Sequence, residues 1–311
     1  MTISSTNQSQ QTHVDGSRVD EVIIVSSPKA GSGAGRDQLP KLIDRLKAAN
    51  ITTTATTSID TMQGRLQQCH DDNKAAVIVA AGGDGTLSLV ADLVENDVAL
   101  VPMPLGTENL LARYYGHTHD AEHVFQTITS GQRKFVDAGR ANGKLFLVMA
   151  TCGFDAEVVR AVHLRRKGHI NRFSYAMPIL RAMKRYAFPA IDVTMDSAEH
   201  GQHECRWAMA FNLPRYGGGL SIEPDAVGDD QKLDVITFKN GGIFSGLCYF
   251  ARVLTRRHRR AGGVVRQTAQ TITFTSKSRV PYQLDGDYAG QLPLSIETLP
   301  GRVQLLVPAD T

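Results

Sequence analysis

The chain has 311 residues, of which 42% are hydrophobic and 21% are charged, and its formal net charge is +3. This is the composition of an ordinary globular protein with room for two medium-sized domains, and the charge is too small to indicate a nucleic-acid-binding protein. The four cysteines lie far apart and form no Cys-x-x-Cys pair, which argues against a disulfide framework or a zinc site and favours the cytoplasm.

The first 20 residues are rich in Ser, Thr and Gln and lack the apolar core of a secretion signal, so we expect a disordered tail. No apolar run approaches the roughly 20 residues that a membrane-spanning helix needs. Two compact basic clusters, residues 165–167 and 256–260, are typical of a solvated face. They would also suit anionic lipid headgroups, which leaves open a peripheral position at the inner face of the membrane.

Strands alternate with helices in the first part of the chain. Strands are predicted at residues 21–26, 51–57, 75–80 and 98–103, and helices at 39–49, 61–70 and 86–95 and from Leu110 onward. This alternation predicts a parallel sheet covered by helices on both faces. Because ligands bind beyond the C-terminal ends of such strands, the small-residue loops at 27–36, 82–86 and 105–109 should converge on one cleft.

The central loop is Gly82-Gly83-Asp84-Gly85-Thr86, between a buried strand and an amphipathic helix. Backbone N–H groups at such a turn and helix start favour phosphate, although an ordinary strand–helix loop is the alternative. The loop at 27–36 carries Lys29 and Arg36 as candidate counter-charges. It matches neither the P-loop nor the dinucleotide-binding pattern, which argues against a P-loop NTPase or a nicotinamide dehydrogenase.

Strands predominate after residue 131. They are predicted at 133–140 and 145–150, joined by Asn142-Gly143, and then at 190–195, 207–212, 233–238, 271–275, 292–296 and 303–307. Helical insertions are predicted at 156–165, 171–186 and 244–257. The change from alternating strands and helices to a succession of strands predicts a second, mainly antiparallel domain. We place the boundary at about Ser130 to Lys134, which gives domains of residues 21–132 and 133–311.

Two acidic turns in the second domain are candidate sites. Residues 225–234 carry four aspartates, and such an oxygen-rich turn either holds a hard cation such as Mg²⁺ or is simply solvated. Leu284-Asp285-Gly286-Asp287 is either an ordinary Asp-Gly hairpin turn or a turn that presents a carboxylate base.

Taken together, these motifs resemble the diacylglycerol kinase catalytic-domain family, which includes bacterial soluble lipid kinases and the sphingosine and ceramide kinases. The resemblance runs from Glu21 to Pro308. The matching segments, in the family's order, are Gly82–Thr86, Pro104–Thr107 with Asn109, Gly153–Ala156, Asn212, Gly217–Gly219, Asp229–Asp234 and Leu284–Asp287. The resemblance implies an N-terminal α/β domain like those of NAD kinases and phosphofructokinases, a C-terminal β-sandwich, and an active site between them.

The resemblance also implies residue roles. Asp84 would act beside the nucleotide and its Mg²⁺, and Asp287 would be the base that takes the proton from a lipid hydroxyl. Asp230, with the backbone carbonyls of Val227 and Lys232, would match a structural Mg²⁺ site of the bacterial enzymes. The residues that would bind ATP are Gly82, Gly83, Asp84, Gly85, Thr86, Gly106, Thr107 and Asn109.

The sequence departs from the family pattern at four places. Ser27-Pro28 stands where Asn-Pro is usual, and Leu110 follows Asn109 where the family commonly has Asp. Gln231 replaces a usual Gly, and Asp287 replaces the usual Glu. The last change keeps the carboxylate but shortens its reach by one methylene, so the acceptor or its position could differ. None of the four removes a group that the chemistry needs.

We therefore predict an ATP-dependent lipid kinase with a diacylglycerol-like acceptor at the membrane surface and no nucleic-acid partner. A kinase of another acceptor such as NAD, and a nucleotide-binding scaffold, remain as alternatives. The oligomeric state is open, and a homodimer is compatible with the sequence. Apolar residues that either line a lipid cleft or belong to the core are Phe154, Ile170, Phe173, Met177, Ile179, Leu180 and Met183.

Overall fold

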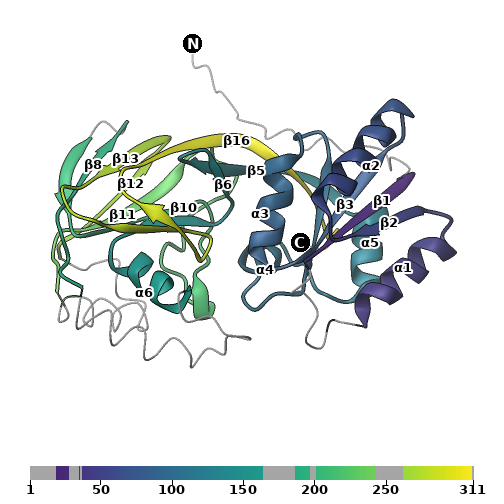
Figure 1. The fold of residues 1–311 in the computed structure, drawn as a ribbon, viewed down its shortest axis with the longest axis horizontal. Coiled ribbons are helices and arrows are strands. Elements are labelled where there is room, and N and C mark those ends of the chain that lie inside the picture. The colour runs from purple at the N-terminus through teal and green to yellow at the C-terminus, as the bar shows by residue number, and fades with distance from the viewer. Residues whose placement is uncertain are drawn as a thin grey trace, which may run out of the picture.

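The computed structural model describes residues 19–27, 35, 37–163, 186–196, 201–242, 245 and 262–309. It has two lobes joined by two long strands, β5 (Gln132–Ala141) and β16 (Leu294–Val307), which run from one lobe into the other (Figure 1). The first lobe is α/β, and the second is built mainly of antiparallel strands. The predicted fold class is confirmed.

The first lobe is organised around a parallel sheet. Its strands are β1 (Glu21–Ser26), β2 (Thr52–Thr56), β3 (Ala76–Gly82) and β4 (Ala99–Pro104), in the order β2-β1-β3-β4. Alternate side chains of each strand point to opposite faces, so Val22 and Ile24 enter one core and Ile23 and Val25 the other. Both faces are therefore apolar and need a cover of helices.

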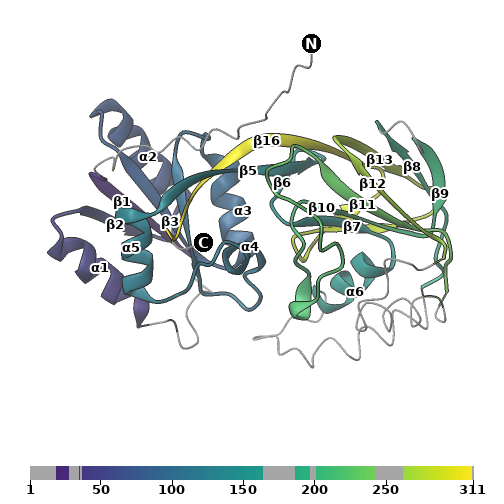
Figure 2. The same cartoon turned by 180° about the vertical axis from the view of Figure 1, so that it is seen from behind.

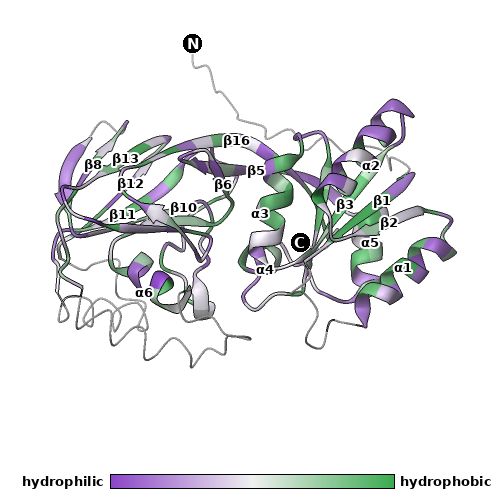
Figure 3. Ribbon diagram, viewed as in Figure 1, coloured by the Kyte–Doolittle hydropathy of each residue, from purple (hydrophilic) through white to green (hydrophobic). Residues whose placement is uncertain are grey.

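Helices cover both faces of this sheet (Figure 2). The apolar sides of α1 (Gln38–Ala48) and α5 (Ala121–Ser130) pack on one face. Those of α2 (Ile59–Asp71), α3 (Asp84–Leu93) and α4 (Leu110–Tyr114) pack on the other. Hydropathy follows this arrangement, with green strands in the middle of the lobe and purple residues on the outer sides of α1 and α2 (Figure 3).

The helix predicted to begin at Leu110 is the short helix α4, and the separate helix α5 was missed. Gly116, with φ of +75°, follows the end of α4, and this left-handed geometry is typical of a helix stop. The chain restarts at Asp120, whose side chain accepts a hydrogen bond of 2.9 Å from the N–H of His123 at the start of α5. Asp120 is thus a regular N-cap that the sequence reading overlooked.

The second lobe is a sandwich of two sheet layers. In the described residues one layer has the strand order β12-β11-β10-β7-β14-β15, and the other runs from β16 through β13 and β8 to β9. An apolar core fills the space between them. The strands are β7 (Met149–Cys152), β8 (Ile191–Met195), β9 (Gln202–Cys205), β10 (Trp207–Phe211), β11 (Leu233–Phe238), β12 (Val264–Ala269), β13 (Thr271–Thr275), β14 (Pro281–Leu284) and β15 (Asp287–Gln291).

The strands predicted at 292–296 and 303–307 are a single strand, β16. Its first residues pair with β13, whereas Gln304 and Leu305 pair in parallel with β4 of the first lobe. A register shift between Leu299 and Val303 lets it bend. At this bulge the N–H of Gly301, with φ of +56°, donates a 2.7 Å hydrogen bond to buried Asp137. The end of the chain thus completes the sheet of the first lobe.

The strand predicted at 145–150 is two strands in different layers. β6 (Lys144–Phe146) pairs with β5 through the predicted Asn142-Gly143 turn, whose residues have φ of +47° and +83°. After Leu147 and Val148 the chain enters β7, which pairs with β10 and β14. At this break the chain passes from one layer of the sandwich to the other.

Several predictions lie outside the described residues. These are the tail up to residue 18, most of the loop at 27–36 with Lys29 and Arg36, both basic clusters, and, apart from residues 186 and 245, the helices predicted at 171–186 and 244–257. The helix predicted at 156–165 corresponds to α6 (Phe154–His163). In the part of the chain that is described, no helix combines the length and the apolarity needed to cross a membrane.

Two glycine substitutions should have opposite effects on stability. A methyl group on Gly139 in β5 would lie 2.0 Å from the ring of buried Phe146, so Gly139→Ala should destabilise the fold by about 1–3 kcal/mol. Exposed Gly64 lies within α2 and has nothing within 4 Å of such a methyl group, so Gly64→Ala should stabilise it by about 0.5–1 kcal/mol. Urea unfolding of both variants tests this, and equal changes would contradict the packing described here.

Candidate active site between the two lobes

The loop between β3 and α3 has the geometry of an anion site. Gly83 is the N-cap of α3, and no side chain caps the N–H groups of the first turn from this position. A methyl group on Gly82 would lie 2.3 Å from Thr86 Oγ1, so only glycine fits under the Thr86 side chain. The first N–H groups of a helix lack intrahelical acceptors and carry the positive end of its dipole. The loop therefore suits a phosphate.

The loop between β4 and α4 packs directly on the first loop. The N–H of Leu105 donates to the carbonyl of Gly82 at 2.9 Å, and a methyl group on Gly106 would lie 2.6 Å from the Cα of Gly83. Asn109, with φ of +50°, accepts from the Gly106 N–H at 3.1 Å and donates to its carbonyl at 2.9 Å. Buried Asn109 thus fixes the loop shape, while Gly106 and Thr107 are exposed at its tip.

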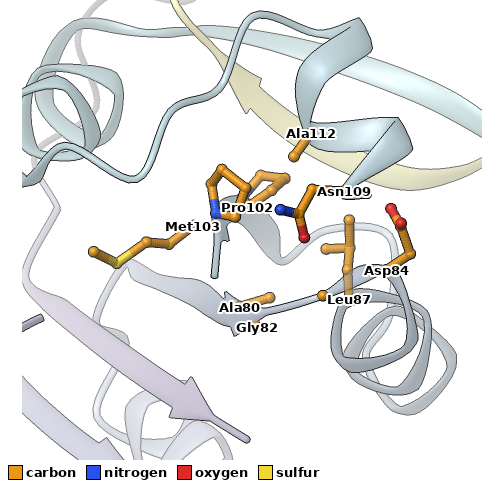
Figure 4. Close-up of a pocket in the computed structure, with 10 residues that line it drawn as sticks. Ala80, Gly82, Asp84, Leu87, Pro102, Met103, Asn109 and Ala112 are labelled. Atoms are coloured by element: carbon orange, nitrogen blue, oxygen red, sulfur yellow. The ribbon is translucent and has the colours of Figure 1, made fainter. Parts of the chain in front are cut away.

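A small pocket lies under these two loops (Figure 4). In that view the amide of Asn109 points between Pro102 and Leu87, and the carboxylate of Asp84 points toward the start of α4. The lining residues are Ala80, Gly82, Gly83, Asp84, Leu87, Pro102, Met103, Pro104, Asn109 and Ala112. The structure thus brings the predicted residues of both loops together.

Asp84 connects α3 to α4. Its carboxylate accepts hydrogen bonds from the N–H groups of Leu110 at 3.0 Å and Leu111 at 3.3 Å. Burial raises the pKa of Asp84 to about 6, and the nearby charge of Asp285 adds to the rise, whereas the two hydrogen bonds oppose it. Asp84 therefore holds the second loop in place, a role that the sequence reading did not foresee.

Asp285 joins the two lobes, and the sequence reading gave it no role. Its carboxylate accepts from the N–H groups of Leu147 and Val148 at 2.8 Å each, and from that of Met149 at 3.0 Å. A fourth hydrogen bond, of 2.8 Å, comes from the hydroxyl of Ser88 on α3. Burial raises the pKa of this carboxyl, while the four hydrogen bonds favour its ionised form.

This contact places Asp287 at the start of α3. Asp285 and Gly286 form the turn between β14 and β15, with φ of +48° and +88°. Asp287, which is exposed, follows as the first residue of β15. A methyl group on Gly85 would lie 3.3 Å from Asp287 Oδ2, so this carboxylate stands against the first turn of α3. Two predicted site residues that are 202 positions apart, Gly85 and Asp287, thus lie close together where the two lobes meet.

Comparison with known families identifies both lobes. Residues 148–307, about half of the chain, match the family model described as the YegS C-terminal NAD kinase beta sandwich-like domain. Residues 21–141 match the diacylglycerol kinase catalytic domain. The chain belongs to the diacylglycerol kinase catalytic-domain family. It is thus a member of a family of kinases.

Relatives from several bacteria align with nearly the whole chain. A diacylglycerol kinase of Mycobacterium tuberculosis is 27% identical, with 93% of this chain and 96% of the relative covered. One of Bacillus subtilis is 22% identical, with 92% and 96% covered. The crystal structure of a diacylglycerol kinase from Bacillus anthracis strain Sterne is 22% identical and has a TM-score of 0.71, with coverage of 94% and 99%. This structural likeness establishes the shared fold.

The loop at 227–232 was predicted to hold a structural Mg²⁺ in this family. Asp230 accepts a hydrogen bond of 3.1 Å from the N–H of Lys232, and Asp229 forms an ion pair of 2.8 Å with Lys134. Asp137 lies beside them and accepts from the N–H of Gln231 at 2.6 Å. The described residues contain no group of three acidic, His or Cys side chains that could hold a metal ion. A cation here would need backbone carbonyls such as those of Val227 and Lys232, so this site stays a prediction.

Of the residues proposed for a lipid cleft, the structure describes Phe154. Its ring is stacked on Phe188, with centroids 5.5 Å apart, and meets Trp207 edge-on at 5.7 Å. Phe154 is therefore part of an aromatic cluster beside α6. Ile170, Phe173, Met177, Ile179, Leu180 and Met183 lie outside the described residues.

The raised pKa of Asp84 gives a pH-dependent contribution to stability. Because the pKa of Asp84 is higher in the folded state than the ordinary value of 3.8 for an aspartate, the folded protein binds the proton more tightly. The contribution of Asp84 to the free energy of unfolding should therefore fall as the pH rises from about 4 to about 6. Asp84→Asn should remove this slope.

The measurement is urea unfolding of the wild type and of Asp84→Asn at several pH values between about 4 and 7. The stability of the wild type relative to the variant should decline across that range. Parallel curves would contradict a half-buried Asp84 with a raised pKa.

Proposed function

We propose that this protein transfers the γ-phosphoryl group of Mg·ATP to the hydroxyl of a lipid, with diacylglycerol or a similar lipid alcohol as acceptor. The observation that carries the proposal is the position of Asp287 against Gly85 at the start of α3. This arrangement sets a carboxylate opposite a phosphate-type loop. Kinase chemistry needs both, because the acceptor hydroxyl must meet the phosphoryl group in line.

The nucleotide side of the proposed site is formed by the first lobe. The N–H groups at Gly83 and Gly85 would receive the phosphate oxygens, and the close packing of Gly82, Gly83 and Gly106 keeps the loop backbones accessible without side chains in the way. Asp84 would stay in its contact with Leu110 and Leu111 and hold the second loop against the first. Preorganised donors of this kind stabilise charge that develops on the transferred group.

The chemistry of the cleft is suited to Mg²⁺. This ion usually binds through one or two carboxylates together with the phosphates of the substrate, and does not need a cage of protein ligands. Asp84 is a carboxylate at the start of α3, and Asp287 on β15 lies beside it. Each oxygen of Asp84 can accept a further bond besides the one from Leu110 or Leu111. When bound, the ion would neutralise charge on the β- and γ-phosphates.

The acceptor side is formed by the second lobe. Asp287 would accept the proton of the lipid hydroxyl as the oxygen attacks phosphorus. Since Asp is one methylene shorter than Glu, the acceptor oxygen would have to approach closer to the turn than it would for a glutamate base. The names of the relatives, which are diacylglycerol kinases over nearly the full length of the chain, support a lipid acceptor over NAD.

Replacement of the base tests the proposal. Asp287→Asn keeps the size of the side chain and removes its basicity, so kcat should fall by about 10²- to 10⁴-fold while the free energy of unfolding stays close to that of the wild type. The measurement is phosphoryl transfer from labelled ATP to dioctanoylglycerol in mixed micelles. Other lipid alcohols and NAD serve as parallel acceptors.

The control is Asp192→Asn, because Asp192 is an exposed aspartate on β8, away from the cleft (Figure 1). It should leave kcat unchanged. Near-normal lipid phosphorylation by Asp287→Asn would reject Asp287 as the base. Phosphorylation of NAD in place of lipids would reject the lipid acceptor, and no transfer to any acceptor by the wild type would reject the kinase proposal.

A further inference from the structure

A buried polar cluster lies directly behind the turn that carries Asp287. Gln283 on β14 is opposite Thr151 on β7 in the antiparallel pair, so their side chains share one face of the sheet. Asp155, in the first turn of α6, reaches the same point. All three residues are at most 6% exposed. Buried polar groups of this kind are costly unless they are hydrogen-bonded to one another.

The cluster is hydrogen-bonded throughout. Thr151 donates from its hydroxyl to Asp155 Oδ2 at 2.5 Å, and Tyr216 donates from its hydroxyl to Asp155 Oδ1. Gln283 donates from Nε2 to Thr151 Oγ1 at 3.0 Å and to Asp155 Oδ2 at 3.4 Å. Its other amide atom, Oε1, accepts the N–H of Gly286 at 2.7 Å.

Each hydrogen bond in this cluster runs from donor to acceptor in the direction that leads from Gly286 or Tyr216 toward Asp155. An ionised carboxylate only accepts, so Asp155 requires hydroxyl and N–H groups from all its neighbours. That requirement fixes the amide of Gln283 with its NH₂ toward Asp155 and its oxygen toward Gly286. The reverse orientation would set the NH₂ group against the N–H of Gly286. Asp155 thus accepts from Thr151, Tyr216 and Gln283, and this arrangement of donors sets which end of Gln283 meets the turn.

The hydrogen bond to Gly286 acts on the residue before Asp287. Gly286 has φ of +88° and no neighbouring atom within 4 Å of the position where a Cβ would be. Packing around that position therefore does not hold the turn. The Gly286 N–H is held by Gln283, and the preceding residue, Asp285, is held by its own contacts with the break between β6 and β7. A displacement of about 1 Å at a reacting group can cost up to about 100-fold in rate. The bond from Gln283 is thus well placed to set the position of the Asp287 carboxylate.

We propose that Gln283 is a positioning residue for Asp287, and that Asp155, through Thr151 and Gln283, sets the orientation of its amide. Tyr216 extends the same cluster to the segment that begins with Gly217–Gly219, so this loop and the Asp287 turn share one hydrogen-bonded support. The catalytic part of this inference rests on the proposed role of Asp287 as the base, whereas its structural part does not.

Hydrogen exchange tests the structural part without any substrate. Gln283→Met keeps the length of the side chain but cannot accept from Gly286, so exchange of the Gly286 amide should speed up by about tenfold. Gln304→Met is the matched control. Gln304 is equally buried and accepts from Arg133 at 2.9 Å in β16, away from the turn, so its loss should leave the exchange of Gly286 unchanged.

Asp155→Asn is the second variant, in case Gln283→Met does not fold. It retains the shape of the side chain and removes the acceptor-only carboxylate, so it should also speed up exchange at Gly286. If both variants left exchange at Gly286 as slow as in the wild type, the proposed support would be contradicted whatever the protein phosphorylates.

A double-mutant cycle tests the catalytic part. With Mg·ATP and dioctanoylglycerol, Gln283→Met should lower kcat by about 10- to 100-fold and leave KM for ATP nearly unchanged. In an Asp287→Asn background it should have little further effect, because the group that it positions is already gone. Equal effects in both backgrounds would show a general loss of structure and overturn the positioning role.

The two failures can be told apart. If the wild type phosphorylates none of the acceptors, the proposed function fails, while the exchange of Gly286 still reports on the support of the turn. If lipids are phosphorylated but Gln283→Met leaves both kcat and the exchange of Gly286 unchanged, the positioning role fails while the proposed function stands.

Discussion

The carboxylate of Asp285 is the contact on which the geometry of the cleft depends. It gathers three consecutive backbone N–H groups at the break between β6 and β7 and adds the hydroxyl of Ser88 from the first lobe. Hydrogen bonds to a charged group contribute about 1.5–3 kcal/mol each, which offsets the cost of burying the charge. The residue two positions later, Asp287, reaches the start of α3 because this contact holds the turn there.

The two strands shared by the lobes, β5 and β16, fix the relative position of the lobes and therefore the Asp285 contact. β16 passes from the second lobe into the sheet of the first, with β5 beside it along its length. The bulge at Gly301 is held by Asp137, which also binds the N–H of Gln231. The lobes are thus connected by continuous strands and not by a flexible linker, so the two halves of the cleft have a defined relation.

Local patterns made most of the first lobe predictable, with helix α5 as the exception. The apolar run of β3, the glycines after it and the periodic side chains of α3 are all contained within about 20 residues, and they predict a strand, a turn and a helix without knowledge of the rest. The Asn142-Gly143 turn was equally readable because its geometry depends on its own two residues. The fold class followed from the order of such elements.

The contacts between distant residues could not be read in this way. Asp285 looked like half of an Asp-Gly turn because its acceptor role depends on N–H groups more than 130 positions earlier in the chain. Asp84 was expected to act beside the nucleotide and its Mg²⁺, and its hydrogen bonds to α4 become visible once the two loops are side by side. Two short apolar runs near the end were read as two strands, although a bulge with a glycine joins them.

The most direct measurement of the central claim is a crystal structure of the protein with Mg²⁺ and a non-hydrolysable ATP analogue. We expect the γ-phosphate at the start of α3, between the Gly85 N–H and the Asp287 carboxylate. A nucleotide bound elsewhere, or one whose γ-phosphate points away from Asp287, would contradict the account.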